Sequence, residues 1–264
     1  MKGLKKRLKE GEILIGTFLS LGNSVTSEIV ANAGFDWVII DIEHGLGSEG
    51  DVLHQLQGIK GTNVSAIVRV EGYQRQRIHR VLDMGADGIM CPRVEDESQA
   101  ELAVKAMQYP PEGIRGVAKM IRATDYGEDF DQYRQKTAED LLGIIQIETA
   151  EALNHLDQIA NVDGVDVLFI GPSDLSMSLG IFGQTDHPLF VTTVDLIIKA
   201  ANKANKHVGI LLSAPGDLKK YHDLGIQLFA CGTDASFLGK GAKQMVEALL
   251  KAQEPSVKTK GKAV

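Results

Sequence analysis

The sequence predicts a (β/α)₈ barrel, in which eight parallel strands form a closed ring inside a layer of helices. Apolar segments suited to buried strands occur eight times, with helical patterns between them. These segments are residues 13–18, 36–41, 65–70, 88–91, 142–147, 166–170, 208–212 and 227–231. In addition, Gly34, Gly85 and Gly225 each separate the end of a helical pattern from the start of a strand, as in consecutive right-handed βαβ units. An open, doubly wound sheet is the alternative.

The remaining segments fit this arrangement in order. Residues 2–9 are a charged run with Leu4 and Leu8 at helical spacing, which predicts an amphipathic helix over one end of the domain. Residues 24–33 are predicted to form the first helix of the ring. Residues 108–136 fit no repeat and are predicted to be an inserted loop over the active-site rim.

The C-terminal part completes a single predicted domain of residues 1–252. Residues 235–252 form an amphipathic pattern that predicts the last helix. Residues 253–264 are rich in Lys and Gly and are expected to be disordered. No segment elsewhere has the composition of a linker between domains.

Composition narrows the class of protein. The chain has 264 residues, of which 44% are hydrophobic and 24% charged, and no apolar run is long enough to span a bilayer. A net charge of −7 argues against a nucleic-acid partner, because phosphate binding needs clustered Lys and Arg. Cys91 and Cys231 cannot form a disulfide framework, and no signal-type apolar segment follows the basic start, so a cytoplasmic location is expected.

Two acids follow neighbouring predicted strands. Glu148 comes after strand 142–147 and Asp174 after strand 166–170. Because parallel strands end at the same rim, the two carboxylates are expected to converge there. Hard oxygen ligands of this kind suit Mg²⁺ or Mn²⁺, which would keep positions for water and substrate. The alternative is that each acid only stabilises the first turn of a helix.

Further polar residues are expected at the same rim. His44 follows the second strand among acids and is a candidate for proton transfer, although it could be an ordinary loop residue. Arg69 ends the third strand between apolar neighbours, so its charge needs an anion. That anion is either a substrate or a barrel acid such as Glu43 or Glu71.

Taken together, these motifs resemble the HpcH/HpaI family of class II pyruvate aldolases over most of the chain. The motifs are Asp41-x-Glu43-His44-Gly45, Arg69-Val70, Met84-Gly85-Ala86-x-Gly88-Ile89 with Cys91-Pro92, Pro110-Pro111-x-Gly113-x-Arg115-Gly116, Gln146-Ile147-Glu148-Thr149 and Gly171-Pro172-x-Asp174-Leu175-Ser176. The resemblance implies a barrel of the phosphoenolpyruvate/pyruvate superfamily. It also implies that the C-terminal helix is exchanged between subunits and that a homohexamer is built from dimers.

The resemblance also implies roles for individual residues. Glu148 and Asp174 would bind the divalent metal. His44 would act in proton transfer, and Arg69 would contact the keto oxygen of the substrate.

Three further assignments follow from the same resemblance. Asp83, just before the Met-Gly-Ala turn, would partner the histidine of a neighbouring subunit. Gln146 and the backbone of Ser173 would line the pyruvate site. The chain departs from many members at Ile42 and at 117–119, and the second departure leaves the acceptor aldehyde open.

The expected reaction is the reversible cleavage of a 4-hydroxy-2-oxo acid to pyruvate and an aldehyde, with negative charge collecting on the C2 oxygen of a pyruvate enolate. Succinic semialdehyde, tartronate semialdehyde and lactaldehyde are all compatible acceptors. A metal would stabilise the enolate as a Lewis acid, and Mg²⁺, Mn²⁺ and Co²⁺ share these ligands. No predicted strand ends in Lys, which disfavours a Schiff-base route.

Two other functions stay open at this point. One is a citryl- or malyl-CoA type lyase of the same superfamily, although no basic groove for the CoA phosphates is evident in the sequence. The other is a non-catalytic barrel that binds a metabolite.

Overall fold

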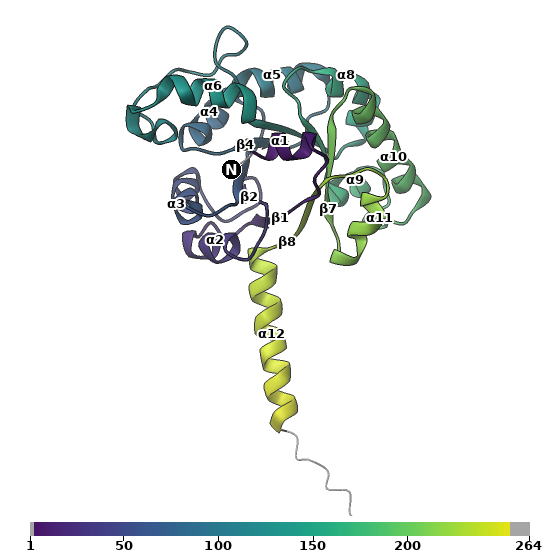
Figure 1. Ribbon diagram of the computed structural model, residues 1–264. Coiled ribbons are helices and arrows are strands. Elements are labelled where there is room, and N and C mark those ends of the chain that lie inside the picture. The colour runs from purple at the N-terminus through teal and green to yellow at the C-terminus, as the bar shows by residue number, and fades with distance from the viewer. Residues whose placement is uncertain (1–2, 254–264) are drawn as a thin grey trace, which may run out of the picture.

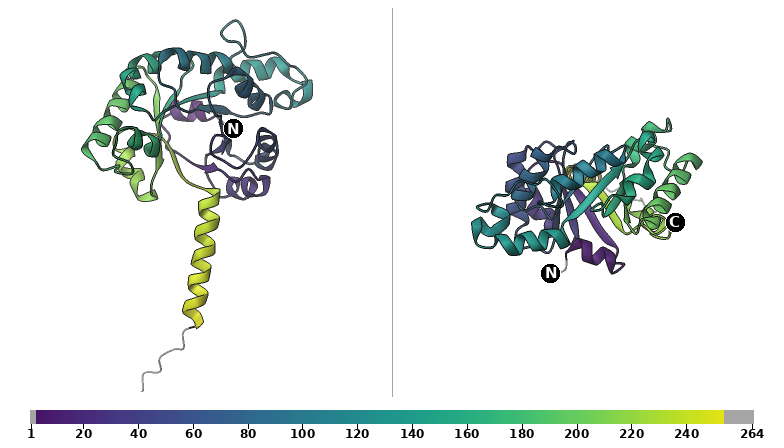
Figure 2. Two further views of the ribbon diagram at one scale, coloured as in Figure 1. Left: turned by 180° about the vertical axis from the view of Figure 1, so that it is seen from behind. Right: turned by 90° about the horizontal axis from the view of Figure 1, so that it is seen from above.

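The computed structural model describes residues 3–253 as a closed barrel. Eight strands, each parallel to the next, follow one another around the ring in chain order (Figures 1 and 2). They are β1 (Leu14–Leu19), β2 (Trp37–Asp41), β3 (Ser65–Arg69), β4 (Gly88–Cys91), β5 (Leu142–Ile147), β6 (Val167–Ile170), β7 (His207–Leu212) and β8 (Leu228–Thr233). All eight correspond to the predicted segments, so the (β/α)₈ barrel is confirmed and the open sheet is excluded.

Helices precede β1, connect successive strands around the outside of the ring and follow β8 (Figure 2). They are α1 (Leu4–Lys9), α2 (Ser24–Ala31), α3 (Glu49–Ile59), α4 (Arg75–Asp83), α5 (Glu97–Met107), α6 (Phe130–Asp140), α7 (Ala150–Asn154), α8 (Leu156–Asn161), α9 (Pro172–Ser178), α10 (Pro188–Lys203), α11 (Leu218–His222) and α12 (Asp234–Gln253). Two 3₁₀ helices, η1 (Arg122–Gly127) and η2 (Pro215–Asp217), complete the set among the described residues. The predicted amphipathic helix at the N-terminus is α1.

The barrel interior is filled by apolar side chains and closed at one end. Leu4 and Leu8 of α1 belong to the same buried cluster as the inward-facing residues of the strands, so α1 closes the amino-terminal end of the ring. Inside, Trp37 and Phe169 meet edge to face with their ring centroids 6.3 Å apart. Gly16 makes room for them, since a Cβ there would lie 2.5 Å from the Trp37 ring. Chemistry is therefore confined to the open, carboxyl-terminal rim.

The segment 108–136 differs from the predicted loop. Its second half contains η1 and the start of α6, and Arg122 donates hydrogen bonds to the carbonyl oxygens of Met84 and Leu56. Those carbonyls lie at the C-terminal ends of α4 and α3, which are at the end of the barrel opposite the rim. The prediction that this segment covers the rim of its own barrel is therefore wrong.

The last helix, α12, leaves the carboxyl end of β8 and extends away from the barrel (Figure 1). Asp234 is its only buried residue. Its large exposed apolar side chains are Phe237, Leu238, Met245, Val246, Leu249 and Leu250. The exchange of this helix between subunits concerns a second chain and stays a prediction. The tail predicted to be disordered lies, apart from Gln253, outside the described residues.

Within residues 3–253, no helix is long and apolar enough to cross a membrane.

Candidate active site

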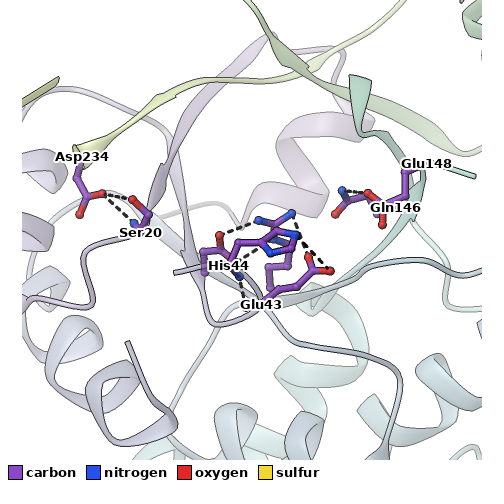
Figure 3. A network of polar contacts seen from close by, with 8 residues as sticks. Ser20, Glu43, His44, Gln146, Glu148 and Asp234 are labelled. Atoms are coloured by element: carbon purple, nitrogen blue, oxygen red, sulfur yellow. Dashed lines mark hydrogen bonds and ion pairs between the residues drawn. The ribbon is translucent and has the colours of Figure 1, made fainter. Parts of the chain in front are cut away.

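The carboxyl ends of neighbouring strands bring most of the predicted site residues to one rim. Arg69 ends β3, and His44 lies in the loop after β2. Gln146 belongs to β5 and Glu148 follows it directly. The last two predicted residues at this rim, Ser173 and Asp174, lie in the first turn of α9, after β6. Figure 3 shows His44 between Glu148 on one side and Asp234 on the other.

Arg69 is held by two acids. Its Nε donates to Oδ1 of Asp41 at 2.9 Å and its Nη2 to Oδ2 of Asp41 at 2.7 Å, while Nη1 lies 3.1 Å from Oε2 of Glu43. Of the two barrel acids considered as alternatives to a substrate anion, Glu43 does pair with Arg69, whereas Glu71 pairs with Arg77. A guanidinium has five N–H donors, so three remain for other partners after the two hydrogen bonds to Asp41, since the Glu43 contact is an ion pair.

His44 is presented to solvent by a tight turn. The backbone N–H groups of Glu43 and His44 both donate to Oδ1 of Asp41, at 3.1 and 3.3 Å. Gly45 is required here, because a Cβ would lie 2.1 Å from the carbonyl oxygen of Asp41. The His44 side chain is 66% exposed and its Nε2 lies 3.8 Å from Oε1 of Glu43. Asp41 therefore fixes both Arg69 and the His44 turn.

Glu148 is buried at the rim. Its pKa is raised to about 7, chiefly by burial and also by the neighbouring charges of Glu43 and Asp174. The backbone N–H of Arg93, at 2.8 Å, and the charge of Arg69 act in the opposite direction. Arg93 adopts a positive φ of 50°, in the turn that directs its N–H at Glu148. The amide nitrogen of Gln146 donates to Oε2 of Glu148. The site thus holds an acid whose charge needs a cation.

These residues fit a divalent metal. Glu148 and Asp174 follow neighbouring strands at the same rim, and the charge of Asp174 contributes to the raised pKa of Glu148. The Gln146 side-chain oxygen is buried without a hydrogen-bond partner. A Cβ on Gly171 would lie 2.8 Å from both the Gln146 amide nitrogen and Oε2 of Glu148, so only glycine keeps this space open. Among the described residues no cluster of three or more His, Cys, Asp or Glu could hold a metal, so water and substrate would supply the other ligands.

Asp83 does not lie at the rim with the other predicted site residues. It ends α4, at the opposite end of the barrel, and its Oδ1 accepts a hydrogen bond of 2.7 Å from Nη2 of Arg115. Arg115 is buried over the rings of Tyr109 and Tyr133, with its guanidinium carbon 4.5 and 5.3 Å from their centroids. Within one chain Asp83 is therefore not brought to His44, and its pairing with the histidine of a neighbouring subunit stays a prediction.

Comparison with known sequences decides the family. Residues 14–239 match the sequence model described as HpcH/HpaI aldolase/citrate lyase. The chain belongs to this family. A hydroxypyruvate/pyruvate aldolase of Paraburkholderia phytofirmans is 37% identical over 250 residues, which cover 92% of this chain and 96% of that protein. A 4-hydroxy-2-oxo-heptane-1,7-dioate aldolase of Klebsiella pneumoniae is 38% identical over 241 residues, 91% of each chain.

Solved structures agree. The crystal structure of an HpcH/HpaI aldolase/citrate lyase family protein from Burkholderia cenocepacia superposes with a TM-score of 0.88, at 35% identity over 93% of this chain and 98% of that one. The chain is therefore an enzyme of the aldolase class within the HpcH/HpaI family.

The structure gives roles to two rim residues to which the sequence assigned none. In this HpcH/HpaI protein Asp41 organises Arg69 and His44; its sequence signals were its place at the end of an apolar strand and in the motif with His44. Asp234, directly after β8, is buried against Ser20 of the β1–α2 loop (Figure 3). The sequence signal that could have pointed to Asp234 is its position as an acid immediately after the last strand.

Proposed function

We propose that this HpcH/HpaI protein is a metal-dependent aldolase that reversibly cleaves a 4-hydroxy-2-oxo acid into pyruvate and an aldehyde. The observation that carries the proposal is the placement at one rim of two acids, Glu148 and Asp174, with the fixed cation Arg69 and the exposed His44. The names of the curated relatives, which include pyruvate aldolases, support pyruvate as one product. Succinic semialdehyde and tartronate semialdehyde are the aldehydes we favour.

Glu148 and Asp174 would hold Mg²⁺ or Mn²⁺, with Co²⁺ as a further candidate for the same ligands. Such an ion supplies a Lewis acid that draws electron density toward the 2-oxo oxygen of the substrate.

Arg69 would stabilise the charge that develops during cleavage. As the C3–C4 bond breaks, its electron pair moves into the C2–C3 bond and negative charge collects on the C2 oxygen. The N–H donors of Arg69 that are left by the two hydrogen bonds to Asp41 can bind that oxygen. Because Asp41 and Glu43 already fix the guanidinium, little reorganisation is needed as the charge forms.

His44 would move the proton. Its imidazole takes the proton from the C4 hydroxyl while the C4 oxygen becomes the aldehyde carbonyl, and protonation at C3 then converts the enolate to pyruvate. Gln146 and the backbone of Ser173 would orient the pyruvate half. In a homohexamer, Asp83 of a neighbouring subunit would hold the imidazole.

Pyruvate release from a panel of 4-hydroxy-2-oxo acids tests the proposal. Each acid is measured with chelator, and again after Mg²⁺ or Mn²⁺ is restored. We expect cleavage to stop with chelator and to return with metal, and the preferred acid to identify the aldehyde. If no acid yields pyruvate with any metal, the thioester lyase or the binding barrel would replace this proposal.

A further inference from the structure

The first residue of α12, Asp234, lies at the rim but takes no part in the proposed chemistry. It is 4% exposed, while the rest of its helix extends into solvent (Figure 1). A buried carboxylate is costly unless hydrogen bonds satisfy it. The donors that satisfy Asp234 therefore show what it holds in place.

Those donors come mainly from the β1–α2 loop. Oδ1 accepts hydrogen bonds from the backbone N–H of Ser20 at 2.8 Å, the Ser20 hydroxyl at 3.0 Å and the backbone N–H of Ala235 at 2.9 Å. Oδ2 accepts from the Leu21 N–H at 3.3 Å and the Thr26 hydroxyl at 3.1 Å. All five donors are neutral groups, so Asp234 orders the loop through hydrogen bonds rather than through an ion pair.

The loop that Asp234 holds is in turn joined to the loop of His44. The carbonyl oxygen of Ser20 accepts a hydrogen bond of 2.7 Å from the N–H of Leu46, two residues beyond His44. The two loops also touch at Gly22 and Gly47, where a Cβ on Gly22 would lie 2.5 Å from the Gly47 Cα. Ser20 thus binds Asp234 through its N–H and hydroxyl and the His44 loop through its carbonyl.

We propose that Asp234 is a positioning residue that sets the place of His44 through Ser20. This inference rests on the proposed function for its catalytic readout. Figure 3 shows the arrangement, with Asp234 and Ser20 on one side of His44 and the metal-ligand candidate Glu148 on the other. Loss of Asp234 would therefore release the His44 loop without disturbing the Glu148 side of the site.

The test compares Asp234→Asn with Asp166→Asn. Asp166 is a matched control, because its carboxylate also accepts a backbone hydrogen bond, from Gly143 at 2.9 Å, but lies at the amino-terminal end of the barrel beside Lys5. We expect Asp234→Asn to lower kcat for pyruvate release by about tenfold to a hundredfold, as a small misplacement of a catalytic group does. KM and the calorimetric Kd for Mn²⁺ should stay at wild-type values, and Asp166→Asn should keep kcat.

A second readout does not depend on activity. The rate at which diethyl pyrocarbonate modifies His44, measured by peptide mass spectrometry, reports the exposure and surroundings of the imidazole directly. This rate should differ from wild type in Asp234→Asn and not in Asp166→Asn. If the wild type releases no pyruvate, the proposed function fails, yet this rate still decides whether Asp234 positions His44.

If Asp234→Asn does not fold, two milder variants test whether Asp234 positions His44. Ser20→Ala and Thr26→Ala each remove one hydroxyl that donates to Asp234, but only Ser20 also contacts the His44 loop. We expect Ser20→Ala to change kcat and the His44 modification rate more than Thr26→Ala does. Wild-type values for both measurements in Asp234→Asn, or equal effects of the two hydroxyl deletions, would overturn the proposal.

Discussion

The carboxylate of Asp41 receives the Arg69 guanidinium through two hydrogen bonds, from Nε to Oδ1 at 2.9 Å and from Nη2 to Oδ2 at 2.7 Å. Both side chains are buried at the rim, and Oδ1 also accepts the N–H groups of Glu43 and His44. One carboxylate thus fixes both the proposed enolate-binding cation and the turn of the proposed proton carrier.

Asp41→Asn is expected to lower both stability and kcat. Removal of one partner of a buried ion pair is strongly destabilising, and because Glu43 would still lie beside Arg69 we expect a loss of up to about 3 kcal/mol of unfolding free energy. Urea denaturation checks the stability and pyruvate release checks kcat. In the double variant with Arg69→Met, the loss of unfolding free energy should be smaller than the sum of the two single losses. Additive losses would show that the pair is not coupled.

His44 and Glu148 should separate proton transfer from metal binding. His44→Ala is expected to slow cleavage by about a hundredfold or more, the usual contribution of a general base, and to leave Mn²⁺ binding unchanged. Glu148→Ala should abolish both. Calorimetry with Mn²⁺ and a pyruvate-release assay check the two variants side by side. Wild-type metal affinity in Glu148→Ala would remove Glu148 from the proposed ligands.

Gly171→Ala tests the space beside the two rim acids. Gly171 has a φ of −96°, which alanine tolerates, so the fold should survive. The added Cβ would lie 2.8 Å from Oε2 of Glu148, and we expect Mn²⁺ affinity to fall by about tenfold or more as the ligand is displaced. Gly216→Ala is the control, since nothing lies within 4 Å of its Cβ position. Equal affinities in the two variants would contradict this reading of the site.

The pKa of Glu148 makes the stability of the metal-free protein depend on pH. Burial raises that pKa from 4.5 to about 7, so between these values the folded state binds more protons than the unfolded state. Stability should therefore fall as pH rises through this window and level off above it. Scanning calorimetry in chelator should show this decline in Tm relative to Glu148→Gln. Saturating Mn²⁺ should oppose it, because metal binding favours the ionised carboxylate.

Local patterns were enough to predict the barrel. Apolar runs between glycine-terminated helices located all eight strands, since burial on both faces leaves a strong signal in the sequence. The position of segment 108–136 was missed, because it depends on hydrogen bonds from Arg122 to carbonyls of α3 and α4, far away in the chain. Every residue has a backbone carbonyl, so the sequence does not show which carbonyls Arg122 contacts.

The site was predictable to a similar degree. Strand ends placed the acids, Arg69 and His44 at one rim. The need of a buried arginine for an anion left a substrate, Glu43 and Glu71 as candidates, of which Glu43 pairs with it. The second anion, Asp41, follows from the register of β2 and β3, in which it is paired with Arg69. The link from Asp234 to the His44 loop depends on how neighbouring loops lie against one another. Asp83 has no rim partner within one chain, so its predicted role requires a second subunit.

Proton exchange at the methyl group of pyruvate tests the enolate directly, without any knowledge of the aldehyde. The protein is incubated with pyruvate in D₂O, and loss of the methyl signal is followed by ¹H NMR with Mn²⁺ removed after the reaction. We predict exchange that requires added metal and is lost in both Glu148→Ala and Arg69→Ala. Exchange that persists in chelator, or that survives both substitutions, would contradict an enolate stabilised by these residues.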